Sequence, residues 1–460
     1  MSKRSRPTWS GWLGALLGAV IFLGWIDVVR TAHIDYVTHL TQAAGSGATR
    51  GSAWRPALIV PEHNNASYGI LDQVRLMTDR DVWRVRRIDY ENAPAGHDVW
   101  TTSPYRWWLA TLAWGDRLLT GHALGPSLES AAMIADPLLH FLLLAATTWL
   151  VAARFGGFAG GAVAVSLVTL FPFALDFLPG MPEDRALVHL AAIWSVLLLV
   201  AGVRAAGAAE PGADRAARRW FVAAGIAGGF GLWVNSPKLA PLLVGILLGG
   251  LIGRLVASWR ARSGAPASLF LPWRAWSLAG AATVLFAWLV EFFPSHLATW
   301  QLQSIHPLYG VAWIGAGELL TLLQAPPGGQ PRLKRAGFAA LAAAAMLAVP
   351  FAMWRTHSPG FFATDLAGSY LTRMREGASA TSFLTWLLQE GFSAPVRATL
   401  LPLLLLVPAL WLLLRRAATA VTATSIALAL GPVLVAVGFA CWQLAWWNEA
   451  GAALIALLVP

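Results

Sequence analysis

The sequence predicts an all-α integral membrane protein with about eleven or twelve transmembrane helices. Of its 460 residues, 57% are hydrophobic and 12% are charged, whereas a soluble domain has about 45–50% apolar and about 25% charged residues. Apolar runs long enough to cross a bilayer recur along the chain, and basic residues gather in alternate connections between them. Together these observations exclude an ordinary soluble globular domain.

The first apolar run, from Gly11 to about Val29, predicts the first span. It is longer than the apolar region of a signal peptide, and no small-residue cleavage motif follows it. Basic residues precede it, so residues 1-10 are predicted to be a cytoplasmic N-terminus and residues 11-460 a polytopic transmembrane domain. Further apolar runs occupy residues 131-153, 156-178, 186-204, 220-235, 239-253, 275-293, 308-325, 336-353, 398-414 and 420-438.

The basic residues support this topology. The chain has 33 Lys and Arg residues against 23 Asp and Glu residues, a formal net charge of +10. Because topology explains the excess charge, no nucleic-acid partner is expected, and we predict a multi-pass protein of the bacterial inner membrane. The basic residues of the predicted cytoplasmic connections are Arg154; Arg204, Arg215, Arg218 and Arg219; Arg254, Arg260, Arg262 and Arg274; Arg332, Lys334 and Arg335; and Arg415 and Arg416.

The opposite side is predicted to present four outer loops, near residues 30-130, 179-185, 294-307 and 354-397. Within the first loop, residues 105-119 predict an amphipathic, Trp-rich helix at the membrane interface. The last apolar run, which starts near Ala450, is too short to span comfortably. It predicts either a short or re-entrant helix or a chain cut from a longer protein.

The short second outer loop has two adjacent carboxylates, Glu183 and Asp184, at the start of a predicted helix. Acidic residues in such a place cap free backbone N–H groups and suit the positive end of the helix dipole. Carboxylate oxygens also suit a hard divalent ion such as Mg²⁺ or Mn²⁺, which leaves positions open for phosphate oxygens. The residues alone leave both interpretations open.

The first outer loop holds a second group of polar residues. Asp35 lies just beyond the first span, and Asp72 lies in a helical-looking stretch. In the basic segment that follows, Arg84, Arg86 and Arg87 either bind phosphate through paired guanidinium hydrogen bonds or form a solvated edge beside anionic lipid.

Ionisable residues inside membrane spans are functional hypotheses by default. Asp136 precedes Pro137 and is expected to satisfy a broken helical turn. Glu318 lies well inside its span and is expected to line a lipid groove or to pair with a basic residue of a neighbouring helix. Glu291 lies near a span end and is expected to reach water.

Three stretches of sequence, taken in order, form a pattern. The first outer loop contains Arg87-x-Asp89, Pro94-x-Gly96 and Trp100-Thr101-x-x-Pro104, the second contains Gly180-x-Pro182-Glu183-Asp184, and a third stretch runs from Gly231 to Lys238. This arrangement resembles the GT-C class of polytopic membrane glycosyltransferases, which includes oligosaccharyltransferases and exopolysaccharide-type enzymes. The resemblance covers roughly residues 10-250.

The resemblance implies transfer of a sugar from a polyprenyl-phosphate or pyrophosphate donor to an acceptor glycan, lipid or protein on the non-cytoplasmic face. In such enzymes, acids of both outer loops face one cavity, often with a divalent metal. Asp184 matches the Asp of the family's Asp-His-His motif, with Arg185 and Ala186 in place of the two His residues. Asp184 is therefore an expected catalytic residue, and Glu183 and Asp184 are expected metal ligands.

The resemblance also implies an acid in the first outer loop. Residues 66-68 are Ala-Ser-Tyr where relatives have that acid, which leaves Glu62, Asp72 or Asp35 to substitute, and Asp72 or Asp35 is expected to take its place near the acceptor. The residues expected to bind the substrate are Arg86, Arg87, Lys238 and His97.

Two other functions remain open. A transporter or flippase of lipid-linked glycans would depend on midplane charges such as Asp136 and Glu318 rather than on Asp184. A GT-C-like scaffold without catalysis is compatible with the altered Asp-His-His motif. Divalent-dependent release of sugar from a polyprenyl donor would distinguish the enzyme from both.

Overall fold

The computed structural model describes residues 10–44, 65–90, 93–262, 269–298, 300–324, 332–356, 382–415 and 418–460. The predicted cytoplasmic segment therefore lies almost wholly outside the described residues, as do Arg416 and most of the predicted loop near 354-397. The chain divides into two compact units, the first comprising residues 1–169 and 174–187 and the second residues 170–173 and 188–460.

The described residues are almost entirely helical, with one pair of two-residue strands. This confirms the predicted all-α membrane fold. Within the described residues, seven helical segments are long and apolar enough to cross a membrane: Gly11–His39, Leu124–Phe155, Arg185–Ala206, Ser236–Ala261, Trp273–Phe292, Ala394–Leu414 and Ala420–Trp442. The bent pair Leu333–Met346 and Ala348–Thr356 would make an eighth span if it crosses as one.

This number is smaller than the eleven or twelve spans expected, because several apolar runs fold as helices that fall short of a full apolar span. The run at 156-178 forms α5 (Gly157–Thr169), which has only 13 residues. The run at 220-235 belongs to α7 (Ala213–Val234), whose first turns contain charged residues. The run at 308-325 forms α10 (Pro307–Gln324), which has 18 residues and includes Glu318.

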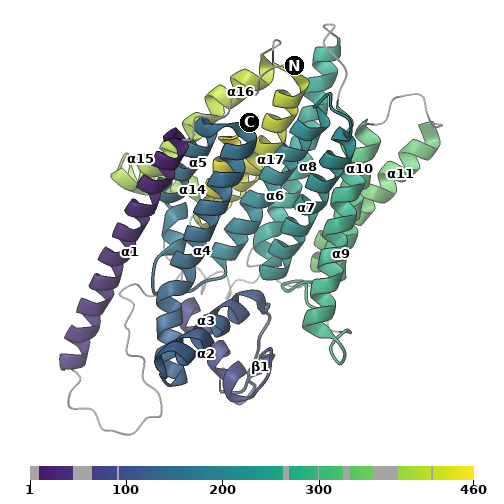
Figure 1. Cartoon of the computed structure of the whole chain (residues 1–460). Helices are drawn as coiled ribbons and strands as arrows, with labels where there is room; N and C mark the ends of the chain where they lie inside the picture. Colours follow the sequence, from purple (N-terminus) through teal and green to yellow (C-terminus); the bar gives the residue numbers. More distant parts are fainter. Residues whose placement is uncertain are drawn as a thin grey trace. The chain divides into compact units, whose positions relative to one another are not determined.

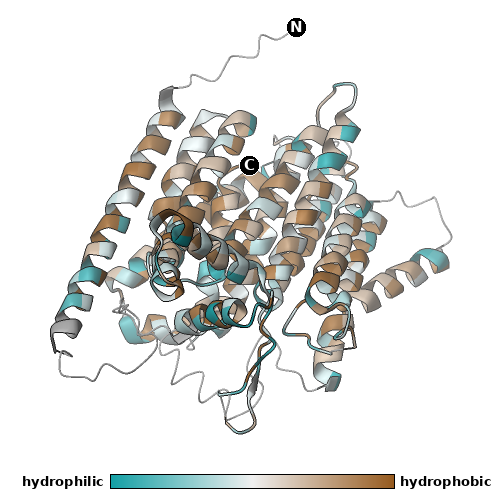
Figure 2. Cartoon of the chain, turned by 60° about the horizontal axis from the view of Figure 1, so that its bottom comes forward, coloured by the Kyte–Doolittle hydropathy of each residue, from teal (hydrophilic) through white to brown (hydrophobic). Residues whose placement is uncertain are grey.

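The first unit contains the helices α1, α4 and α5 and the described part of the first outer loop. α1 (Ser10–Ala44) packs on α4 (Leu124–Phe155) and α5. Figure 2 shows α1 as hydrophobic over most of its length and more hydrophilic toward its C-terminal end. The helix therefore continues past its apolar part into a polar part.

The structured part of the first outer loop consists of α2 (Asn65–Asp79), β1 (Arg87–Ile88), β2 (His97–Asp98) and α3 (Pro104–Thr120), grouped near one end of α4 (Figure 1). The antiparallel strands pair Arg87 with Asp98 and Ile88 with His97. Both predicted helices of this loop are thus confirmed. A small apolar core holds the group together, formed by Met77, Val85, Ile88 and Val99.

The second unit is a helical bundle. Its first long helix, α6 (Arg185–Ala206), starts in the last residues of the first unit and is buried over almost all of its apolar length. The short 3-10 helix that precedes α6, η1 (Phe173–Phe177), belongs to the first unit except for Phe173. The other elements of the second unit are α7, α8 (Ser236–Ala261), α9 (Trp273–Phe292), α10, α11 (Arg332–Met346), α12 (Ala348–Thr356), α14 (Phe383–Glu390), α15 (Ala394–Leu400), η3 (Leu401–Leu405), α16 (Leu406–Leu414), α17 (Ala420–Trp442), η4 (Leu444–Trp446) and α18 (Trp447–Leu457).

Two features of this bundle follow directly from the sequence. Asn235 separates α7 from α8, because its side chain accepts the N–H of Lys238 as an N-cap and Pro237 follows in the first helical turn. The last apolar run forms α18, which has 11 residues and is buried against α17. The helix is short, as the length of the apolar run in the sequence predicted.

Candidate functional site

A buried carboxylate in the first unit ties the second outer loop to α4. The side chain of Asp136 is fully buried. Its Oδ1 accepts a hydrogen bond from the Tyr105 hydroxyl at 2.7 Å, and its Oδ2 accepts one from the backbone N–H of Glu183 at 3.3 Å. Asp136 therefore connects α3, α4 and the acidic loop, and these hydrogen bonds go to groups outside α4 rather than to a broken turn of its own helix, as had been expected.

The backbone of α4 supplies further anchors next to Asp136. Pro137 has no N–H and so interrupts the helical hydrogen-bond ladder at this level. In the preceding turn, the carbonyl of Ala132 accepts the N–H of Gly180 at 3.2 Å, and the carbonyl of Ala135 accepts the indole N–H of Trp108 at 3.2 Å. Gly180 has a φ of 78°, which favours glycine at this tight approach.

Several acidic side chains gather around the Tyr105 hydroxyl. Burial, and then the negative charges of Asp136, Asp184 and Glu183, raise the pKa of Tyr105 well above its ordinary value. The phenol therefore stays protonated and acts as a donor at neutral pH. The contribution of Asp184 to this rise in pKa indicates that its half-buried carboxylate interacts electrostatically with the Tyr105 hydroxyl.

Arg185 balances part of this negative charge. Its Nε lies 2.7 Å from Oε2 of Glu183, and its Nη1 lies 3.6 Å from Oδ1 of Asp176. The two carboxylate side chains are 15% and 9% exposed, whereas the arginine side chain is 39% exposed. Arg185, which stands where relatives have the first His of the motif, thus bridges two acids at the start of α6.

α1 brings another acid and base to the same loop. Nη2 of Arg30 lies 3.5 Å from Sδ of Met181, and Asp27 precedes Arg30 by about one helical turn. Oδ1 of Asp27 is enclosed and has no hydrogen-bond partner among the described residues. The sequence analysis missed this pair because it assigned Asp27 to the first span. The signal that could have revealed it is an acid and an arginine three residues apart at the end of that span.

The geometry can be compared with known proteins. Neither a protein-family model nor a curated protein sequence matches the chain. Solved structures do match: the Archaeoglobus fulgidus oligosaccharyltransferase tethered to an acceptor peptide containing the NVT sequon aligns with a TM-score of 0.63 at 11% identity, over 98% of this chain and 49% of that chain.

Two further structures of this archaeal enzyme agree. Oligosaccharyltransferase AglB from A. fulgidus, in complex with an inhibitory peptide and a dolichol-phosphate, has a TM-score of 0.60 at 12% identity and covers 97% of this chain and 50% of that chain. The complex with Zn and sulfate has a TM-score of 0.56 at 12% identity, with 97% and 48% covered. The chain thus spans about half the length of these solved chains.

The fold is that of the GT-C membrane glycosyltransferases. At this identity the likeness establishes the fold alone. The GT-C resemblance predicted from the sequence motifs is therefore confirmed for the fold, and the roles of the individual residues stay predictions.

Two predicted acids of the GT-C site lie in different surroundings from Asp184. Asp35 follows Asp27 on α1 by eight residues, or about 12 Å along the axis. Its side chain is 65% exposed and lies 3.9 Å from His39, one turn further on. Asp72 lies on α2, where it accepts a hydrogen bond from the hydroxyl of Tyr90. Asp35 thus contacts a side chain of its own helix, and Asp72 contacts a side chain of the same outer loop.

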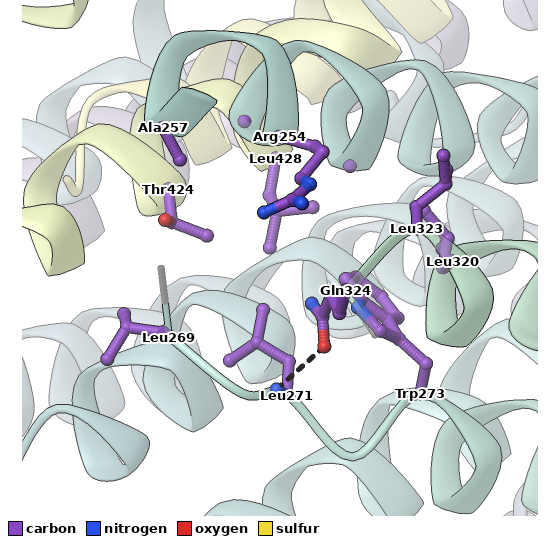
Figure 3. A pocket seen from close by; sticks show the side chains of 12 residues that line it. Arg254, Ala257, Leu269, Leu271, Trp273, Leu320, Leu323, Gln324, Thr424 and Leu428 are labelled. Carbon is purple, nitrogen blue, oxygen red and sulfur yellow. Dashed lines mark hydrogen bonds between the residues drawn. The ribbon is translucent and has the colours of Figure 1, made fainter. Parts of the chain in front are cut away.

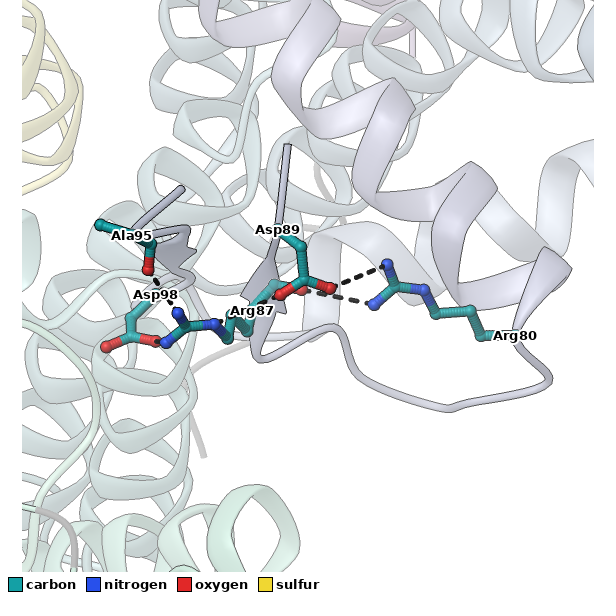
Figure 4. A network of polar contacts seen from close by, with 5 residues as sticks. All are labelled: Arg80, Arg87, Asp89, Ala95 and Asp98. Carbon is teal, nitrogen blue, oxygen red and sulfur yellow. Dashed lines mark hydrogen bonds and ion pairs between the residues drawn. The ribbon is translucent and has the colours of Figure 1, made fainter. Parts of the chain in front are cut away.

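The predicted phosphate-binding arginines lie in or beside the β1–β2 hairpin. Figure 4 shows Arg87 at the centre of a network that also contains Arg80, Asp89 and Asp98. Its Nε lies 3.3 Å from Asp89 and its Nη1 3.5 Å from Asp98, while Nη2 donates to the carbonyl of Ala95. The guanidinium therefore holds the hairpin closed.

The remaining predicted contacts are more scattered. The carbonyl of Arg86 accepts the N–H of Val99 at 2.8 Å next to the hairpin, and the backbone of His97 lies in β2 opposite Ile88. Lys238 lies in the second unit, where its Nζ is 3.4 Å from Glu449 and 4.8 Å from the centroid of the Trp446 ring. Whether these residues bind substrate stays a prediction.

The two other acids inside predicted spans are both paired. Glu291 is fully buried and accepts the indole N–H of Trp233 at 2.8 Å, so the expectation that it reaches water is wrong. Glu318 receives two hydrogen bonds from Arg274, at 2.8 and 2.9 Å. This agrees with the expected pairing to a basic residue of a neighbouring helix.

The side chains of the second outer loop do not by themselves form a binding site for a divalent metal. No group of three or more His, Cys, Asp or Glu side chains able to hold a metal ion occurs within the described ranges. Glu183, one of the two expected ligands, is engaged by Arg185. We therefore derive no chemical step through a metal, and the ligand roles of Glu183 and Asp184 stay a prediction.

Replacing Tyr105 by Phe should destabilise the protein. The change leaves a buried oxygen of Asp136 without its donor, which costs about 1–3 kcal/mol. We expect a lower midpoint of thermal unfolding for the purified protein in detergent. Tyr36→Phe is the matched control, because Tyr36 is 63% exposed on α1 and its replacement should leave the midpoint unchanged. Equal midpoints for both variants would contradict the role of the Tyr105 hydroxyl.

Proposed function

We propose that this protein is a membrane glycosyltransferase that transfers a sugar from a polyprenyl-phosphate or pyrophosphate donor to an acceptor on the non-cytoplasmic face of the bacterial inner membrane. The observation that supports this most is the acidic second outer loop, which Asp136 anchors to α4 within a GT-C fold. The proposed orientation, with a cytoplasmic N-terminus, rests on the basic connections.

The proposed reaction displaces the donor phosphate from the anomeric carbon of the sugar. The acceptor oxygen or nitrogen forms the new bond to this carbon, and the carbon–oxygen bond to phosphate breaks with its electron pair leaving on the phosphate. A carboxylate near the acceptor takes the acceptor's proton, and cationic groups stabilise the negative charge on the leaving phosphate. The first unit offers both kinds of group.

We assign the acceptor side to Asp184 and Asp27. Asp184 is half-buried beside the anchored loop, and the enclosed Oδ1 of Asp27 has an unused acceptor position in the described structure. Arg30 and Arg185 are the cations of this group, and both contact the loop or its acids. They are placed to stabilise phosphate charge, with or without a divalent ion of the kind first expected at Glu183 and Asp184.

A lipid-linked donor also needs an apolar surface. The second unit has a pocket of about 270 Å³ lined by α8, α10, α12 and α17. Nearly all of its lining side chains are apolar, among them Leu243, Val244, Trp313 and Phe439. Such a surface suits an isoprenoid chain, and one structural neighbour was solved with a dolichol-phosphate. These observations support a polyprenyl donor and leave the sugar and the acceptor open.

The transporter alternative receives less support. It depended on Asp136 and Glu318 as charges along a midplane path. In the structure Asp136 is bonded to Tyr105 and Glu183, and Glu318 is paired with Arg274. Both acids thus have a structural partner that a transport role does not require.

Replacing Asp184 by Asn should abolish sugar transfer while the protein stays folded. The assay is release of radiolabelled sugar from polyprenyl-phosphate donors in proteoliposomes, with and without Mg²⁺ or Mn²⁺. We expect a fall in kcat of about 100-fold or more, since loss of a positioned proton acceptor typically costs about 10²–10⁴-fold. Asp214→Asn, at the start of α7, is the control. Normal transfer by the Asp184→Asn protein would overturn the assignment.

A pair of variants on α1 separates the two candidate acids of that helix. Asp27→Asn should lower kcat with little change in KM for the donor, because Asp27 lies one turn from the contact with the second outer loop. Asp35→Asn should retain transfer, since that carboxylate is exposed and distant along the helix. The reverse result, with loss only in Asp35→Asn, would restore the sequence-based choice.

A further inference from the structure

A second and smaller pocket, of about 30 Å³ and with polar groups in its lining, lies in the second unit, among α8, α9, α10 and α17. Figure 3 shows its lining: Arg254 of α8, Trp273 at the start of α9, Gln324 at the end of α10 and Thr424 of α17 surround one space. Leucines complete the wall, namely Leu269, Leu271, Leu320, Leu323 and Leu428. Nothing in the proposed sugar transfer uses this pocket.

The polar groups of this pocket are mainly hydrogen-bond donors. Arg254 contributes a guanidinium, and none of the lining residues is acidic. The Oε1 of Gln324 accepts the N–H of Leu271 at 2.9 Å, so its amide NH₂ is the end available to another group. A pocket with this chemistry favours an anion over a cation.

An unsatisfied donor points to the same conclusion. The side chain of Trp273 is 1% exposed, and its indole N–H has no hydrogen-bond partner within the described structure. A buried donor without a partner costs free energy of about 1–3 kcal/mol, so such groups call for an explanation. An anionic oxygen in the pocket would give this N–H an acceptor and would lie beside the positive charge of Arg254.

The surroundings suggest that the anion belongs to a lipid. Arg260 and Arg262 follow Arg254 at the end of α8, and Arg274 lies in the first turn of α9. This is the arginine-rich end of the helices, which the positive-inside rule places on the cytoplasmic side. Basic pockets between spans on that side suit anionic lipid head groups.

We propose that this pocket binds the phosphate group of an anionic phospholipid of the cytoplasmic leaflet. The phosphate lies between Arg254, the Trp273 indole N–H and the Gln324 amide. The site is separate from sugar transfer and does not depend on the proposed function.

Native mass spectrometry of the full-length protein in detergent, titrated with phosphatidylglycerol or phosphatidylcholine, tests this proposal. The wild type should bind phosphatidylglycerol in preference to phosphatidylcholine. Arg254→Gln should weaken phosphatidylglycerol binding about tenfold or more, as expected for loss of a charged hydrogen-bond donor. Arg262→Gln is the matched control, because this exposed arginine at the same end of α8 does not line the pocket.

Two further arms keep the test decisive. Trp273→Phe keeps an aromatic, though smaller, side chain and removes the N–H, and should weaken binding several-fold even if Arg254→Gln does not fold. Inorganic phosphate should raise the unfolding temperature less than phosphatidylglycerol does at equal concentration. Equal lipid binding by wild type, Arg254→Gln and Trp273→Phe would overturn the site, and equal stabilisation by inorganic phosphate would contradict a lipid as the ligand.

Discussion

The hydrogen bonds of Asp136 are the constraint on which the candidate site depends. A carboxylate buried in an apolar span is tolerated only when its oxygens have partners. Here the two partners are the Tyr105 hydroxyl and the Glu183 N–H. Because both belong to segments outside the span, satisfying the carboxylate also fixes α3 and the second outer loop on α4. The contacts of Gly180, Arg185 and Met181 then follow from a loop that is already held in place.

Only 12% of the residues are charged, and the structure gives these charged residues different roles. Several serve the architecture: Arg87 closes a hairpin, and Arg260 donates to the carbonyls of Leu413, Arg415 and Ala418. Asp27 and Trp273 have a different kind of environment, because each has a buried polar atom without a partner among the described residues and lies beside a candidate site. Such an atom is costly unless a ligand or water satisfies it, so it supports a candidate site that other observations have already located.

Much of the fold was predictable because its signals are local. Apolar runs predicted an all-α membrane protein, an amphipathic pattern predicted α3, a helical-looking stretch around Asp72 predicted α2, and short motifs predicted the GT-C fold. The site was predictable only in part. Glu183 and Asp184 stand out in the sequence because they are adjacent acids in a short loop. Their long-range contacts and those of Lys238 do not stand out: Asp136 anchors Glu183, and Glu449 pairs with Lys238. Each of these pairs is far apart in sequence, so no local pattern reveals it. Asp27 was missed for a related reason, since hydropathy assigns it to a span and only the contact of Arg30 with Met181 relates it to the loop. Among the described residues, fewer helices than expected are long and apolar enough to span a membrane, because apolar composition does not fix helix length.

Hydrogen exchange at the second outer loop tests the central claim most directly. The measurement compares peptides covering residues 178 to 187 between the wild type and Asp136→Ala, with peptides from the middle of α6 as the internal reference. If Asp136 anchors the loop, exchange there should accelerate about tenfold or more, which corresponds to a loss of about 1.4 kcal/mol of local stability, while α6 exchanges as before. Unchanged exchange in the loop of a folded Asp136→Ala protein would show that the loop is held by something else, and would contradict this account.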